Sequence, residues 1–257
     1  SGTMVIPFLA LYLTKKIGVT PTEAGTALLV YGAAAFIAAP LTGKLSDKIG
    51  SLKVMKFALF GSGILFFVYS FIADYNWILA ATFILAAVNE SFRPANLSFI
   101  TEIVGPSQRR MAFALNRLAI NAGMSIGPVI GGFLTLIDYH YLFYANAVAS
   151  ILAGIYFSSV KWSSLSSTKE IEEVNDQKPK VRFAILSDKY FLFFLFAVIP
   201  ANLVFFQHLG ALPLYIVDDL GYTTAAFGLF GSINTVLIII AEVPLNNWMN
   251  DTPYKKS

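Results

Sequence analysis

The sequence predicts an all-α protein that crosses a membrane several times. Its residues are 56% hydrophobic and only 13% charged, whereas soluble domains carry about 25% charged residues. Apolar stretches of about 20 residues, the length that crosses a bilayer as a helix, recur along the chain. The lysines and arginines fall mainly on every second connection between these stretches. Together, these observations predict that lipid is the main solvent of the chain.

Eight apolar stretches are predicted to be membrane spans. The first, at roughly 1–14, has no charged segment before it and no small-residue cleavage site after it, so we do not interpret it as a signal peptide. We expect it to be the second part of a helix whose start is missing. Seven complete spans are expected at 24–42, 54–73, 77–101, 112–137, 141–160, 190–217 and 225–245.

One long polar connection divides the chain. Residues 161–189 hold a run of serines followed by a run of acidic residues, a composition typical of a solvated linker. We therefore expect an N-terminal six-helix bundle with a truncated first helix at 1–160, a linker at 161–189, and the first two helices of a truncated second bundle at 190–257.

The positions of the basic residues predict the orientation. The connections after spans 2, 4, 6 and 8, together with Lys56 at the start of span 3, hold 14 of the 18 lysines and arginines, whereas those after spans 1, 3, 5 and 7 hold only Lys15 and Lys16. Cytoplasmic loops carry the excess of Lys and Arg in membrane proteins. The even-numbered loops and the linker are therefore expected in the cytoplasm, and the protein in the inner (plasma) membrane.

A short pattern occurs on both sides of the linker. At an offset of 203, Leu11, Tyr12, Gly18, Thr20 and Gly25 recur as Leu214, Tyr215, Gly221, Thr223 and Gly228, and one residue further on Pro40 and Asp47 recur as Pro244 and Asp251. This repeat predicts that spans 7 and 8 are a second copy of spans 1 and 2; chance similarity of two apolar hairpins is the alternative. Transporters are known that consist of two parallel six-helix copies around a central site, so four further spans are expected.

Ionisable residues inside the spans are candidates for a functional site, because inserting Arg, Lys or Asp at a span centre costs roughly 2.5–3.5 kcal/mol. Glu90 and Arg93 are three residues apart in span 4 and can neutralise each other as a structural ion pair. The functional alternative is that Glu90 or Glu242 binds and releases a proton, because a low dielectric favours a neutral carboxyl group. The predicted proton or substrate cavity comprises Glu90, Arg93, Arg117, Asn121, Asn202, Gln207, His208 and Glu242.

The connection between spans 2 and 3 contains the most specific motif. Its glycines allow a tight turn, and Asp47 lies where a helix begins or ends, facing a helix N-terminus or a cation. The predicted gating residues here are Gly43, Asp47, Lys48, Gly50 and Lys53. The segment resembles the loop 2–3 signature of the major facilitator superfamily, Gly-x-x-x-Asp-(Arg/Lys)-x-Gly-(Arg/Lys)-(Arg/Lys), except that Ser51 and Leu52 replace the last two basic residues. An ordinary basic loop is the alternative.

The resemblance extends to the junction of spans 4 and 5, where Glu102 precedes Pro106, Arg109 and Arg110. In that family the acidic residue joins a charge network with the loop 2–3 signature, so the resemblance implies a gating role; interfacial capping is the alternative. The family also places spans 1, 2, 4, 5, 7 and 8 around the cavity. It often carries an arginine in span 4 nearer the outer face, but this chain has none around Thr82 and Phe83, so that role is not assigned to Arg93.

Span 5 contains small residues at every fourth position, which let helix backbones approach closely, and a proline that frees a backbone carbonyl. The residues are Gly123, Gly127, Pro128, Gly131 and Gly132. They resemble the family's antiporter motif, Gly-x-x-x-Gly-Pro-x-x-Gly-Gly, although Ala114 stands where the family often has a further glycine. The resemblance is to the branch that exchanges drugs for protons.

The sequence argues against several other functions. It has no cysteine and two widely separated histidines, so we expect no metal site, no cofactor and no catalytic triad. A phosphate-binding loop is also missing, which argues against ATP-driven pumping. We expect a monomeric secondary transporter, not an enzyme, that works by alternating access. Its partners would be protons, a small molecule or drug that it exports by antiport, and the bilayer, but not nucleic acid. The alternatives are a proton-coupled or facilitated importer of a metabolite, and a helical membrane protein without transport activity.

Overall fold

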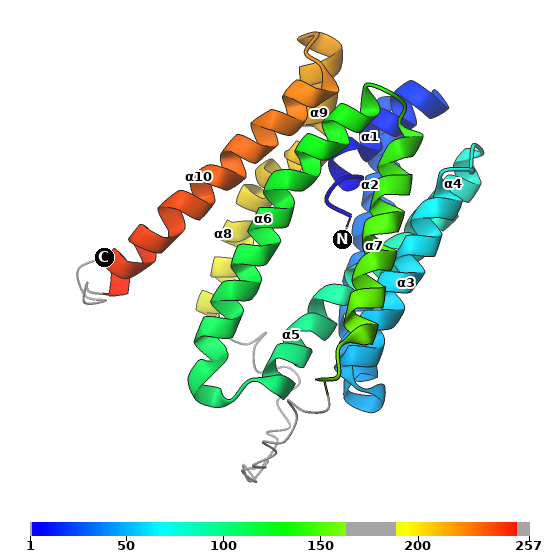
Figure 1. Cartoon of the computed structure of the whole chain (residues 1–257). Coiled ribbons are helices and arrows are strands. Elements are labelled where there is room, and N and C mark those ends of the chain that lie inside the picture. Colours follow the sequence, from blue (N-terminus) through cyan, green and yellow to red (C-terminus); the bar gives the residue numbers. More distant parts are fainter. Residues whose placement is uncertain (1, 163–188, 251–257) are drawn as a thin grey trace.

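The computed structural model describes residues 2–162 and 189–250, and every regular element among them is a helix (Figure 1). The linker, predicted at 161–189, therefore lies almost entirely outside the described residues, as does Asp251. The first predicted span consists of a 3₁₀ turn at Ile6–Phe8, α1 at Leu9–Tyr12 and a π-turn at Leu13–Ile17. The other helices are α2 Pro21–Ile49, α3 Ser51–Tyr69, α4 Tyr75–Glu90, α5 Phe92–Ile103, α6 Arg109–Thr135, α7 His140–Ser159, α8 Lys189–Phe205, α9 Ala211–Leu214 and α10 Thr224–Asn250.

The helices agree with the predicted membrane spans. Among the described residues, five helices are long and apolar enough to cross a bilayer: Pro21–Ile49, Ser51–Tyr69, Pro106–Thr135, His140–Ser159 and Phe191–Leu209. The predicted fourth span is divided at Ser91 into α4 and α5. Pro94 explains the break, because proline lacks an N–H group and its ring clashes with the carbonyl four residues earlier, that of Glu90.

The helix ends lie at two opposite ends of the bundle (Figure 1). We call the "linker end" the one where α2 meets α3, α5 meets α6, and α7 ends at Ser159; the "far end" is the opposite one, where α6 meets α7. The connection predicted at 43–53 is almost wholly helical, since α2 continues to Ile49 and α3 begins at Ser51. Only Gly50 breaks the helix, with φ +93°, a conformation that glycine adopts without a steric penalty. The tight turn is therefore confirmed, but it is shorter than predicted.

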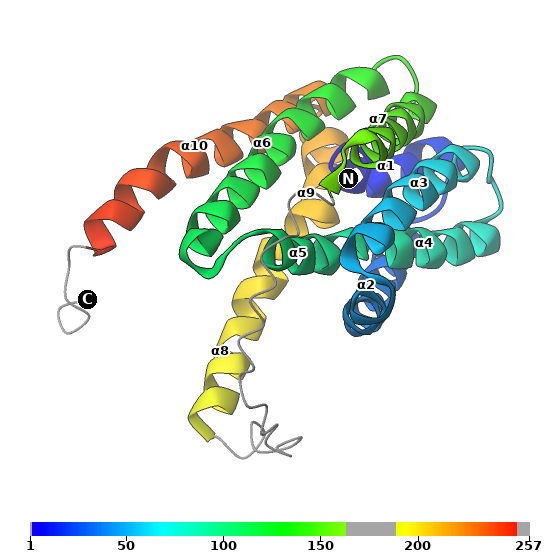
Figure 2. The ribbon, with the colours of Figure 1, turned by 60° about the horizontal axis from the view of Figure 1, so that its bottom comes forward.

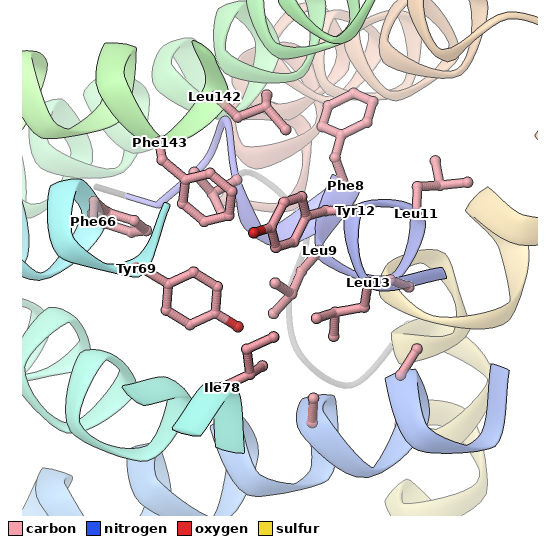
Figure 3. Close-up of a cluster of buried hydrophobic side chains, with 14 of the residues drawn as sticks. Phe8, Leu9, Leu11, Tyr12, Leu13, Phe66, Tyr69, Ile78, Leu142 and Phe143 are labelled. Atoms are coloured by element: carbon pink, nitrogen blue, oxygen red, sulfur yellow. The ribbon is translucent and has the colours of Figure 1, made fainter. Parts of the chain in front are cut away.

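The first span lies in the centre of the hydrophobic core. Its side chains from Phe8 to Leu13 are at most 2% exposed, as expected for a helix that is apolar on all sides. The ring of Tyr12 packs edge-on against Phe143 of α7 with centroids 4.8 Å apart, and Tyr69 of α3 stacks on the same ring at 5.1 Å (Figure 3). The other helices therefore assemble around this segment.

The outer surface of the bundle is apolar. Phe36 is 82% exposed, Trp77 70% and Phe193 76%. Soluble monomers rarely expose large apolar patches of this kind to water. Between helices, by contrast, small residues allow close packing. A Cβ atom on Gly63 of α3 would lie 2.6 Å from Cγ1 of Ile151 in α7, so the predicted spans 3 and 6 pack directly against each other. The surface is suited to lipid.

The backbone repeats together with the sequence. The first span ends in the π-turn Leu13–Ile17 and Gly18 with φ +83°, while the segment after α9 ends in the π-turn Tyr215–Asp219 and Gly221 with φ +70°. Equivalent hydrogen bonds close both turns. The N–H of Val19 donates to the carbonyl of Leu13 at 3.2 Å, and the N–H of Tyr222 donates to the carbonyl of Ile216 at 3.1 Å. The local structure thus follows the predicted offset of 203.

The two parts of the chain meet near the far end. Helices α6 and α10 lie side by side there, whereas α8 extends away from the first bundle toward the linker end (Figure 2). None of the residues of Phe191–Leu209 within the most apolar window is buried. The second part of the described chain therefore touches the first bundle mainly through α9 and α10.

Candidate functional site

A polar cluster surrounds the carboxylate of Glu90 at the break between α4 and α5. The hydroxyl of Tyr31 in α2 donates to Oε1 of Glu90 at 2.7 Å, and Nδ2 of Asn89 donates to the same oxygen at 3.2 Å. Asn89 also donates to the hydroxyl of Tyr31 at 2.9 Å. Since the Glu90 side chain is only 21% exposed, these bonds replace part of the hydration that a carboxylate loses on burial.

Arg93 holds the second oxygen of this carboxylate. Its Nε lies 3.5 Å from Oε2 of Glu90, so the ion pair that the three-residue spacing predicts is present. The distance exceeds the 2.7–2.9 Å of a strong charge-assisted hydrogen bond, and the Arg93 side chain is 70% exposed. A guanidinium group in the middle of a span is stable only beside water or polar groups. Arg93 therefore marks a polar environment next to Glu90.

The polar face continues from α5 to α6. Arg93 and Asn96 are three residues apart in α5 and therefore share one face of this helix, while Arg93 also contacts Glu90 at the end of α4. Nδ2 of Asn96 donates to Oδ1 of Asn116 in α6 at 2.7 Å. Two neighbouring helices of the predicted cavity are thus connected beside the carboxylate.

The break in the fourth span is held by the same helix that supplies Tyr31. Thr42 of α2 donates to the hydroxyl of Ser91 at 2.8 Å, and Ser91 donates to the carbonyl of Ala87 at 2.6 Å. Sequence reasoning did not identify Tyr31, because one tyrosine in a long apolar helix has no distinguishing spacing. Only its contact with Glu90 shows its importance.

The other predicted cavity residues are not gathered at Glu90. Asn202 donates to the carbonyl of Val198 at 3.0 Å, and Nδ1 of His208 lies 2.6 Å from the carbonyl oxygen of Phe205. Each side chain thus contacts its own helical segment. Gln207 lines a cavity of about 320 Å³ between the two parts of the chain. Arg117 and Asn121 lie on α6. The side chain of Glu242 lies outside the described residues.

At the linker end, the predicted gating motif forms a different contact from the one expected. Glu102 accepts a hydrogen bond from the hydroxyl of Ser51, which is fully buried. Ser51 stands where the family signature has a basic residue, so a hydroxyl replaces the expected cation. Arg109 reaches the carbonyls of Thr101 and Val104, at 3.4 and 3.5 Å, distances at which hydrogen bonds are weak.

The ion pairs that the signature implies for Asp47 are not present among the described residues. Among the described residues, no ion pair joins Asp47 to Lys48, Lys53 or Arg109, and Asp47 is exposed near the C-terminal end of α2. The physical reason lies in the two departures from the signature. Ser51 is neutral, and the basic side chain comes two residues later, at Lys53. Gly43 lies within α2, and Arg110 begins α6 together with Arg109.

The glycines of span 5 give α6 two packing faces. A Cβ atom on Gly127 would lie 2.5 Å from Oγ1 of Thr3, and one on Gly131 would lie 2.8 Å from the carbonyl oxygen of Met4. On the other face, a Cβ atom on Gly132 would lie 2.6 Å from the carbonyl oxygen of Thr224 in α10. Gly123 meets nothing within 4 Å. The motif therefore packs α6 against both the first span and α10.

Polar contacts reinforce the packing of α6 against α10. The hydroxyl of Thr135 donates to that of Thr224 at 2.7 Å, and the hydroxyl of Ser232 donates to the carbonyl of Ser125. Nearer the linker end the same helices are exposed, with Met111 at 64% and Leu237 at 60%. Contact between the two parts of the chain is thus concentrated at the far end (Figures 1 and 2).

Charged side chains gather on the far end outside the spans. Lys15 lies 2.5 Å from Asp218, and Lys16 lies 2.8 Å from Asp138, where each distance joins Nζ to a carboxylate oxygen. The backbone N–H of His140 and the ammonium of Lys16 lower the pKa of Asp138 from its ordinary value of 3.8 to about 2. Sequence reasoning did not assign these four residues a function.

The fold and this site define a class of protein. Apolar helices surround a central segment, an ionisable cluster lies inside the spans, and glycine-rich contacts join a repeated second part. These are features of a helical membrane transporter. The chain belongs to the Major Facilitator Superfamily, whose family model matches residues 1–256. Members of this family are transporters rather than enzymes.

Several curated proteins are similar to this chain. The uncharacterized MFS-type transporter YqjV of Bacillus subtilis is 27% identical over 95% of this chain and 60% of its own length. The Na(+), Li(+), K(+)/H(+) antiporter of Planococcus maritimus is 24% identical over 98% of this chain and 66% of its own length. The quinolone resistance protein NorA of Staphylococcus aureus is 26% identical over 59% of this chain and 39% of its own length. The chain thus spans about two thirds or less of each relative's length.

Proposed function

We propose that the protein is a proton-coupled secondary transporter that exports a small molecule by antiport. The observation that carries this proposal is the environment of Glu90. Its carboxylate lies within a span, accepts hydrogen bonds from Tyr31 and Asn89, and has a loose ion pair with Arg93. Relatives that include a cation/proton antiporter and a quinolone resistance protein support antiport.

The geometry of the cluster provides a way to couple a proton to a movement. When Glu90 is ionised, its negative charge attracts the guanidinium of Arg93. When a proton binds to Glu90, the ionic attraction is lost and Arg93 becomes available to other anions or to water. Tyr31 and Asn89 keep the carboxyl group in place during this exchange. Protonation of Glu90 would therefore change the charge that a substrate meets in the cavity.

We place the linker end in the cytoplasm, on the basis of its lysines and arginines. The two bundles expected at 1–160 and 190–257 would then be in contact on the outer side, through α6 and α10. In this orientation, the Glu90 cluster receives substrate from the cytoplasm and releases it after the far end opens. The protein would do this as a monomer in the plasma membrane.

Accumulation in whole cells tests the direction of transport. The probes are a fluorescent quinolone and, separately, the chloride salts of Na⁺, Li⁺ and K⁺. Export driven by protons predicts that an uncoupler raises the amount of probe inside cells that express the protein, relative to cells that do not. A fall in accumulation would instead establish an importer. If no probe responds, these substrates are excluded.

Replacement of the carboxyl group tests the coupling. Glu90→Gln keeps the shape of the side chain but cannot exchange a proton, so we expect proton movement driven by the probe in proteoliposomes to disappear. The matched control is Asp74→Asn at the far end, because asparagine caps a helix as well as aspartate does and Asp74 caps α4 through Asn76 and Trp77. Undiminished proton movement in Glu90→Gln would exclude Glu90 as the carrier.

A further inference from the structure

Lys15 and Asp218 occupy corresponding positions in the two copies of the repeat. They are separated by the repeat offset of 203. Each lies in the π-turn that ends the first span of its copy, Leu13–Ile17 or Tyr215–Asp219. Their side chains nevertheless contact each other, with Nζ of Lys15 at 2.5 Å from Oδ1 of Asp218. Equivalent positions meet where they lie near the axis that relates two copies. The pair therefore marks this axis at the far end.

The charges at this meeting point are opposite. Corresponding residues of a repeat are often alike, and two lysines or two aspartates so close together would repel each other. Here one copy supplies a cation and the other an anion. The contact between the two copies is thus attractive because the repeat is not identical at this position.

We propose that the ion pair of Lys15 and Asp218 is a latch that holds the far ends of the two bundles together. This inference rests on the proposed alternating access, because a latch has a function only if the far end opens. The pair joins the first span to the segment after α9, so separation of the bundles breaks it. It therefore stabilises only the state in which the far end is closed.

Two neighbouring charges, those of Lys16 and Asp138, are paired with each other. Lys16 binds Asp138 at 2.8 Å, and Asp138 also accepts from the backbone N–H of His140 at 2.8 Å. Tyr139 is close to Asp218, whose charge adds to burial in raising the pKa of this phenol. Lys16, Asp138 and His140 all belong to the first bundle. Their contacts do not cross between bundles and do not depend on closure.

The distance between two spin labels measures closure directly. The chain contains no cysteine, so Thr22→Cys and Leu220→Cys introduce one site in each bundle at exposed far-end positions. In lipid nanodiscs, we expect Lys15→Ala or Asp218→Ala to raise the ratio of long to short distances by up to about fivefold, the largest effect typical of an exposed ion pair. High salt should change the unsubstituted protein in the same direction, because it screens exposed charges.

A charge exchange and a neighbouring lysine serve as controls. The double variant Lys15→Asp with Asp218→Lys should restore the original ratio, because the pair is rebuilt in reverse. Lys16→Ala removes a similarly exposed lysine, 38% against 47% for Lys15, whose partner lies in the same bundle, and should leave the ratio unchanged. Restoration by exchange would not occur if the substitutions merely loosened the local structure.

The results separate the latch from the function on which it rests. Two distance populations that are insensitive to Lys15→Ala and Asp218→Ala would reject the latch and leave alternating access intact. A single short distance in the unsubstituted protein and in every variant would contradict both. A shift in Lys16→Ala as large as in Lys15→Ala would also reject the latch.

Discussion

Tyr31 shows how one hydroxyl group can organise a membrane-embedded carboxylate. It donates to Glu90 and accepts from Asn89, so the three side chains form a closed set of hydrogen bonds between α2 and α4. In a low dielectric such bonds are strong, and a missing partner is costly. The position of Glu90 thus depends on a residue 59 positions away in the sequence.

We expect Tyr31→Phe to weaken proton coupling while the protein stays folded. The ring remains, but Glu90 loses a hydrogen bond to a charged group, which is typically worth about 1.5–3 kcal/mol. Proton uptake driven by the probe should fall roughly tenfold or more, as 1.4 kcal/mol corresponds to a factor of ten. Proteoliposomes with an internal pH dye measure this. Tyr156→Phe, an exposed tyrosine of α7, is the control; equal loss in both variants would show a general effect on folding.

At the far end, Asp138 makes stability depend on acid pH. Its pKa is lowered to about 2 in the folded protein from an ordinary value of 3.8. A carboxyl group with a lowered pKa stabilises the fold above its unfolded pKa, and this contribution is lost as pH falls through the folded pKa. The melting temperature should therefore decrease more between pH 4 and pH 2 in the unsubstituted protein than in Asp138→Asn. Parallel curves would contradict the lowered pKa of Asp138 that the His140 N–H and Lys16 produce together.

Helix α6 shows why two glycines of the same motif differ in how closely they pack against other helices. A Cβ atom on Gly132 would lie against the backbone of α10, whereas one on Gly123 would meet none of the described residues within 4 Å. The sequence shows only the spacing of the two residues, which is compatible with close packing at either one. Their surroundings are set by α10, which lies about a hundred residues further along the chain.

A pair of alanine substitutions in this motif tests the contact. Gly132→Ala would place Cβ at 2.6 Å from the Thr224 carbonyl oxygen and 2.9 Å from Cα of Ala225, so the helices must shift, and overpacking typically costs about 1–3 kcal/mol. A Cβ atom on Gly123 would meet no atom of the described residues within 4 Å, so Gly123→Ala should be neutral or stabilising by up to about 1 kcal/mol, because alanine favours helix. Thermal unfolding in detergent compares them. Equal melting temperatures would contradict the packing of α6 on α10.

The interrupted fourth span also has a local cause with distant consequences. The sequence predicts one continuous span at 77–101, and Pro94, which lacks an N–H group, favours the break that the structure shows near Ser91. The direction of the break is set by α2, which supplies Thr42 to Ser91 and Tyr31 to Glu90. The proline favours a break but does not enforce one, since Pro40 and Pro128 lie inside the unbroken helices α2 and α6; contacts with α2 determine where the carboxylate then lies.

In the whole molecule, the two parts of the chain pack at the far end through α6 and α10 and through the pair of Lys15 and Asp218. The contact of Lys15 with Asp218 joins equivalent positions of the repeat, whereas α6 and α10 correspond to the predicted spans 5 and 8 and are not equivalent segments. The linker-end contact of Ser51 with Glu102 stays within the first bundle. The described contacts between bundles are therefore concentrated at one end, as the proposed movement of the far end requires.

The sequence by itself determined the spans, the tight turn at Gly50, the repeat and the pairing of Glu90 with Arg93. These properties depend on local hydrophobicity, on glycine and on residues within one helical turn, all of which can be read along the chain. The tertiary structure decided which polar groups meet across helices: Tyr31 with Glu90, Ser51 with Glu102, and Lys15 with Asp218. Such contacts join residues far apart in the chain, so their formation depends on how whole helices pack.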